Sequence, residues 1–152
     1  AGCKLANMTL YEALLIAHVL GVTVWLGGSL MMLLLWRKAL ASTDPAAISM
    51  QAATGLWFDR RLVIPSSLVV LLAGGWLMTE GSWGMDQGWL HIGMAAVFAA
   101  AGVSLLWTGR MEKRVAGGAA FSALAGRITL GMVISIALML VAFWAMIVKP
   151  FA

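Results

Sequence analysis

The sequence predicts an all-α integral membrane protein, a bundle of four transmembrane helices. Of its 152 residues, 62% are hydrophobic and 11% are charged, whereas an ordinary soluble domain carries about 25% charged residues. The apolar residues form continuous runs rich in Leu, Ala, Met and Gly, and they do not alternate with polar residues as the strands of a membrane β-barrel do. Because each span needs about 20 residues, this length accommodates one domain of four helices.

Four apolar runs are long enough to cross the hydrocarbon core of a bilayer. Charged residues lie at the ends of these runs. For example, Arg37 follows the first run and Arg110 follows the third. Residues 1–8 are typical of a cloning remnant or a flexible N-terminus ahead of the first span. We expect a single transmembrane domain over residues 9–152, with spans at about 10–36, 62–78, 88–107 and 128–148.

The two longer connections should contain further helix. Between the first two spans, Ser42-Thr43-Asp44-Pro45 has the form of a helix start with Pro at the first helical position. This pattern predicts a short interfacial helix at about 45–58. The connection at 109–126 carries basic residues followed by a Gly/Ala-rich stretch, so we expect it to be partly helical and to lie at the membrane surface.

The basic residues predict the orientation of the bundle. Both longer connections carry them, whereas the loop at 79–87 has only Glu80 and Asp86 as charges. Since cytoplasmic loops are enriched in Lys and Arg, both termini should be periplasmic in a bacterial inner membrane. The net charge of +4 then reflects topology, and no nucleic-acid partner is expected. The basic residues are Arg37, Lys38, Arg60 and Arg61 around the first connection, and Arg110, Lys113, Arg114 and Arg127 around the second.

Aromatic residues near the ends of the spans fit this arrangement. Trp36, Trp57 and Trp107 fall at the expected cytoplasmic interface, and Trp76, Trp83 and Trp89 fall toward the other one. Tryptophan is enriched at membrane interfaces because its ring is amphipathic. We therefore interpret most of the tryptophans as an aromatic belt.

Two histidines are the strongest candidates for function. An ionisable side chain within a span costs a few kcal/mol to insert, so its presence indicates a role. His18 lies about eight residues into the first span, and His91 lies near the outer end of the third. Because these two spans run in the same direction, both histidines belong to the outer half of the bundle, offset by about 7 Å along its axis.

Small and aromatic residues share the helix face of His18. Gly21, Trp25 and Gly28 follow it at helical spacing. These glycines could leave room for a cofactor or metal bound by His18. Alternatively, they let a neighbouring helix approach closely, with His18 hydrogen-bonded to that helix. We favour the ligand role.

The third span offers a second ligand. His91 and Met94 lie one turn apart, and either a His/His or a His/Met pair is suitable for a haem iron. Most of the 11 methionines are interpreted as adaptable apolar filler. Thioether ligation of a soft ion such as Cu(I) is the alternative.

The same residues carry a resemblance to known membrane proteins. His18-Val-Leu-Gly-Val-Thr-Val-Trp25-Leu-Gly27-Gly28 resembles the first-helix signature His-x6-Trp-x-Gly/Ala-Gly of small four-helix membrane proteins. These include the HemJ-type protoporphyrinogen IX oxidases, an uncharacterised family of integral membrane proteins and the membrane domain of CopD copper-resistance proteins. Gly88-Trp89-Leu90-His91-Ile92 and Val148-Lys149-Pro150-Phe151 are similar to HemJ-type stretches, so the resemblance covers the chain from about Thr9.

The resemblance implies a haem b-containing membrane oxidoreductase with His18 as an axial ligand. The chain has Gly93 where HemJ-type proteins have Lys, and Arg127-Ile-Thr-Leu-Gly131 where they have an Arg-x-x-Asn-Glu-x-Pro-like sequence. The uncharacterised relatives are more similar. The resemblance therefore implies the fold and a haem more directly than it implies a reaction. Porphyrinogen oxidation and electron transfer to a quinone or another redox membrane protein both remain open.

Two other functions remain as alternatives. One is a copper-handling membrane protein resembling the CopD domain, in which His18, His91 and Met94 would be metal ligands. The other is a non-catalytic scaffold subunit, whose small-residue helix faces would bind another membrane protein. The same Gly-rich faces would also suit a homodimer.

Overall fold

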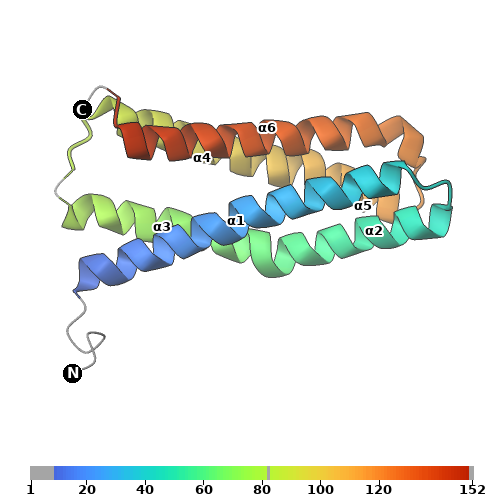
Figure 1. Ribbon diagram of the computed structural model, residues 1–152, viewed down its shortest axis with the longest axis horizontal. Coiled ribbons are helices and arrows are strands. Elements are labelled where there is room, and N and C mark those ends of the chain that lie inside the picture. The colour runs from blue at the N-terminus through green and yellow to red at the C-terminus, as the bar shows by residue number, and fades with distance from the viewer. Residues whose placement is uncertain (1–8, 82, 151–152) are drawn as a thin grey trace.

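The structure is a bundle of four long helices that run alternately up and down (Figure 1). This computed structural model describes residues 9–81 and 83–150, so the expected remnant at 1–8 lies outside the described residues. Within them, four helices are long and apolar enough to cross a membrane, which confirms the predicted four-span, multi-pass architecture. These helices are Leu10–Leu40, Pro45–Glu80, Gly88–Ala116 and Phe121–Val148.

The first helix, α1 (Leu10–Leu40), begins at a capping box. The hydroxyl of Thr9 accepts from the backbone N–H of Glu12 at 3.3 Å, and the Glu12 carboxylate accepts from the backbone N–H of Thr9 at 2.9 Å. Both donors would otherwise be unpaired at the helix start. Helix capping therefore accounts for the presence of an acidic residue, Glu12, at the start of the first span. The last helix, α6 (Phe121–Val148), ends near the start of α1, at the same end of the bundle (Figure 1).

The second long helix is longer than predicted. Its first part, α2 (Pro45–Phe58), begins as expected, with the Asp44 side chain accepting from the backbone N–H of Ala46 at 2.9 Å. It is not a separate interfacial helix, because it continues through a π-helical turn, η2 (Asp59–Val63), into α3 (Ile64–Glu80). Pro65 explains the wider turn, since proline has no N–H to donate to the carbonyl four residues earlier.

The third long helix continues beyond its predicted end in the same way. A π-helical turn, η3 (Val103–Thr108), joins α4 (Gly88–Gly102) to α5 (Gly109–Ala116). Much of the expected surface loop is thus helical. Thr108, Glu112 and Val115 lie on the buried face of this segment, because positions i, i+4 and i+7 share one side of a helix.

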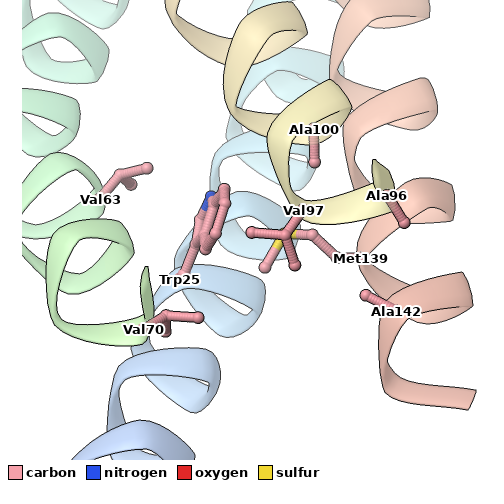
Figure 2. Close-up of a cluster of buried hydrophobic side chains, with 8 residues drawn as sticks. All are labelled: Trp25, Val63, Val70, Ala96, Val97, Ala100, Met139 and Ala142. Atoms are coloured by element: carbon pink, nitrogen blue, oxygen red, sulfur yellow. The ribbon is translucent and has the colours of Figure 1, made fainter. Parts of the chain in front are cut away.

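The core of the bundle surrounds one tryptophan. Trp25 is 1% exposed, and Figure 2 shows valines around its ring and small residues where α4 and α6 approach. Large apolar side chains cover the outside of the helices, consistent with a lipid bilayer. The core cluster consists of Trp25, Val63, Val70, Ala96, Val97, Ala100, Met139 and Ala142.

Two glycines of α1 let neighbouring helices approach closely. A Cβ added at Gly21 would lie 2.9 Å from Cγ2 of Val70 and 3.2 Å from the carbonyl oxygen of Ser66, both on α3. A Cβ at Gly28 would lie 2.8 Å from the ring of Phe58 on α2. Small residues serve this purpose in membrane bundles. The surroundings of Gly21 and Gly28 therefore support the second role considered for them, close packing of a neighbouring helix.

Candidate functional site

A cavity of about 460 Å³ lies at the end of the bundle where α1 begins and α6 ends. All four long helices and the loop between α3 and α4 contribute to its wall. Most lining side chains are apolar or aromatic, and its volume is in the range of small-molecule and cofactor sites. His18, Met94 and Lys149 bring a nitrogen, a sulfur and a positive charge to this apolar space.

His18 lines the cavity with one ring nitrogen already bonded. Its Nδ1 lies 3.0 Å from the carbonyl oxygen of Val70. Because a carbonyl only accepts hydrogen bonds, Nδ1 carries the proton and Nε2 keeps its lone pair. A second nitrogen fixed in this way is typical of histidines that ligate metals.

Gly74 of α3 provides the space for this imidazole. A Cβ at Gly74 would lie 2.9 Å from Cε1 and 3.1 Å from Nδ1 of His18. The neighbouring Gly75 also lines the cavity, and no atom lies within 4 Å of its Cβ position. The ring orientation therefore depends on the absence of a side chain at Gly74 in particular.

Three methionines face the same cavity. Met94 on α4 was predicted as a candidate ligand, and it does line the wall. Met78 of α3 and Met146 of α6 line it too, although the sequence indicated only apolar filler at both positions. Their thioether sulfurs are soft donors beside an imidazole nitrogen.

His91 does not line the cavity. It lies on an exposed face of α4, and its Nε2 is 2.7 Å from the carbonyl oxygen of Met85. The buried residues nearby are Leu90 and Gly93. The structure thus brings His18 together with Met94, and it does not bring His18 together with His91.

The other three predicted site residues lie outside the cavity wall. Gly21 and Gly28 are in the close helix contacts described above, and Trp25 is in the core cluster. The indole nitrogen of Trp25 is buried and has no hydrogen-bond partner among the described residues. These residues support the helix that carries His18, and they do not themselves face the space beside it.

An aromatic rim with one cation borders the cavity. The ammonium group of Lys149 lies 5.1 Å from the ring centre of Trp83 and 5.3 Å from that of Trp89. The two tryptophan rings meet edge to face at 5.4 Å, so the rim is a cation–π cluster. In the sequence, Lys149 was noted as part of the ending Val148-Lys149-Pro150-Phe151 that is similar to HemJ-type proteins, and no site role was assigned to it. Its position one residue after the last apolar run, beside an aromatic interface, is the signal that could have identified it.

Comparison with known protein families, with curated proteins and with solved structures finds no match for this chain.

Proposed function

We propose that the chain is a haem b-binding redox protein of the bacterial inner membrane, with His18 as one axial ligand and Met94 as the other. The observation that carries this proposal is the bonding of His18. Its Nδ1 is held by the Val70 carbonyl at 3.0 Å, and its free Nε2 belongs to a ring that lines an apolar cavity. That is the arrangement expected of an axial imidazole.

The other residues that line the cavity are also suitable for haem b. Apolar side chains such as Leu15, Val97 and Phe98 suit the faces of a macrocycle, and Lys149 provides a cation for one of its carboxylates. When bound, haem b would supply one-electron transfer at its iron. The chain would position the iron between α1 and α4, shield it from water with the Trp83 and Trp89 rim, and favour a higher potential through the thioether of Met94.

The proposed orientation places the cavity near the periplasmic face. The loop between α3 and α4 lines the cavity and is acidic, whereas the basic connections lie at the other end. By the positive-inside rule that basic end is cytoplasmic. An electron partner, either a quinone or another membrane protein, would approach from the periplasmic half, and so would a porphyrin substrate if the chain is an oxidase of the HemJ type.

The optical spectrum of the wild-type protein tests the proposal. We expect protein purified in mild detergent from haem-replete cells to show a Soret band, with sharp α and β bands after dithionite reduction. Iron should be present at about one atom per chain. A colourless protein under these conditions would contradict the haem proposal and would be the result expected of a scaffold subunit.

A copper-handling protein is the second candidate, because three methionines line the same cavity as His18. No group of three or more His, Cys, Asp and Glu side chains within residues 9–81 and 83–150 is placed to hold a metal. A copper site would therefore depend on the thioethers of Met78, Met94 and Met146, which suit Cu(I). Copper without iron in the purified protein would favour this function over the haem proposal.

Replacing Gly74 with Ala should weaken haem binding. The added methyl group would collide with the His18 ring, 2.9 Å away, and would disturb its bond to Val70. Loss of a supporting contact of this kind typically lowers metal affinity by about 10-fold or more. Haem content per chain and the reduction midpoint measure the effect. Gly27→Ala is the matched control, since the Cβ of Gly27 meets nothing within 4 Å and this residue does not line the cavity. An equal loss in both variants would contradict the positioning role of Gly74.

A further inference from the structure

The basic end of the bundle contains a buried carboxyl group, that of Glu112. This α5 side chain is 1% exposed. The indole nitrogen of Trp36 on α1 donates a hydrogen bond to its Oε1 at 3.0 Å, and the Trp36 ring stacks on Phe121 of α6 at 5.3 Å. Trp36 is thus a buried partner of Glu112, and it does not belong to the aromatic belt expected from the sequence.

A second carboxyl group lies against Glu112. Asp59, in the π-helical turn η2, is half-buried, and its carboxyl group lies close to that of Glu112. Gly55, one turn earlier on the same face, lies beside Glu112, because a Cβ there would be 3.7 Å from Oε1 of Glu112. The two carboxyl groups therefore meet where the second and third long helices pack together.

One oxygen of this pair lacks a donor. Oε2 of Glu112 is buried and has no hydrogen-bond partner among the described residues. Burying a carboxylate costs several kcal/mol unless a charge or donor compensates. Of the groups that contact Glu112 from the neighbouring elements, Trp36 and Gly55 are uncharged and Asp59 is acidic. The eight basic residues that flank the two connections are all exposed.

We propose that Asp59 and Glu112 form a proton-binding site, in which the buried carboxyl group of Glu112 and the half-buried one of Asp59 share one proton. The shared proton removes the repulsion between two adjacent carboxylates and supplies the donor that Oε2 lacks. This proposal is independent of the haem proposal, because the pair lies at the opposite end of the bundle from the cavity.

The route to this site is expected from the basic end. Gln51 lies two turns before Asp59 on the same face of α2, and its buried side-chain nitrogen also lacks a partner among the described residues. α2 starts at Pro45, at the connection to α1. The polar side chains at positions 51 and 59 therefore lie on the face of the second long helix that leads from the loop toward Glu112.

Infrared spectroscopy of the full-length protein in detergent tests the shared proton. The other four acidic side chains, Glu12, Asp44, Glu80 and Asp86, are exposed, so none of them is a buried carboxyl group that could account for a protonated-acid band. We expect the wild type at neutral pH to show the C=O stretching band of one protonated carboxylic acid, shifted in D₂O. The band should be lost in both Glu112→Gln and Asp59→Asn. In each variant the amide N–H donates to the remaining carboxylate, so no shared acidic proton is needed.

Glu80→Gln is the matched control and should leave the band unchanged. Both amide variants preserve side-chain size, and circular dichroism shows whether they remain helical. The wild-type spectrum is informative whatever the variants do. Absence of the band from the wild type, as expected if a metal cation neutralised the pair, would overturn the proposal. Persistence of the band in folded Glu112→Gln or Asp59→Asn protein would also overturn it.

Discussion

His18→Ala is expected to abolish haem binding while the bundle stays folded. The substitution removes the nitrogen that lines the cavity and leaves the Val70 carbonyl without its partner. No other imidazole lines the cavity wall, so the iron would lose its nitrogen ligand. The Soret band of the purified variant should fall to the level of free haem, with helicity by circular dichroism as the check on folding. Partial recovery of the band with added imidazole would show that the cavity persists.

Two further variants separate the possible ligand pairs. His91→Ala should retain the wild-type spectrum, because this side chain is exposed and bonded to its own loop. Met94→Ala should retain haem but lower its reduction potential, since thioether ligation raises the potential of a haem. Loss of haem in His91→Ala together with an unchanged spectrum in Met94→Ala would contradict the arrangement proposed here.

The largest effect on stability is expected from Gly21→Val. Its Cβ would lie 2.9 Å from the Val70 side chain and 3.2 Å from a backbone oxygen of α3, and a backbone atom cannot move aside without displacing the helix. Overpacking of this kind costs about 1–3 kcal/mol. For a chain of this length that corresponds to a fall of roughly 2–12 °C in Tm, measured by circular dichroism in detergent.

Gly27→Val is the matched control on the same helix. No atom lies within 4 Å of the Cβ position of Gly27, and the residue is exposed. Its Tm should equal or exceed that of the wild type, because glycine is a poor helix former. Equal destabilisation by the two substitutions would mean that helix propensity or insertion, and not close packing at Gly21, determines the effect.

The spans could be predicted because a bilayer demands long apolar runs. The first and last helices extend over the predicted regions, and the start of α2 at Pro45 follows from its cap. Helical segments were expected at 45–58 and within 109–126, but their continuity with the second and third spans was not. Their continuation as helix depends on a π-helical turn and on burial of a polar face against other helices, and hydropathy does not report either property.

The site could be predicted only in part. His18 could be identified because an ionisable side chain within an apolar span costs free energy to insert into the bilayer. Which face of α4 points inward was not predictable, because a membrane helix is apolar on all sides and its rotation is determined by packing around residues such as Gly93 and Ala96. His91 therefore remained a candidate beside Met94 until the structure placed it outside.

Glu112 illustrates a signal that was present but weak. It stands among Arg110, Lys113 and Arg114, where an acidic residue is typical of a solvated surface segment. The spacing of Thr108, Glu112 and Val115 does indicate one buried helix face. The segment was expected to be partly helical but to lie at the membrane surface, so burial of this face was not expected.

The two π-helical turns divide the second and third long helices into two halves each, whereas α1 and α6 run through without such a turn. An added residue rotates everything beyond it on a helix by about 100°, so η2 and η3 allow each half of the second and third long helices to present its own face inward. Substitutions that reshape the cavity end then need not disturb the alignment of Asp59 with Glu112. A bundle built in this way could acquire a new ligand at one end and retain its chemistry at the other.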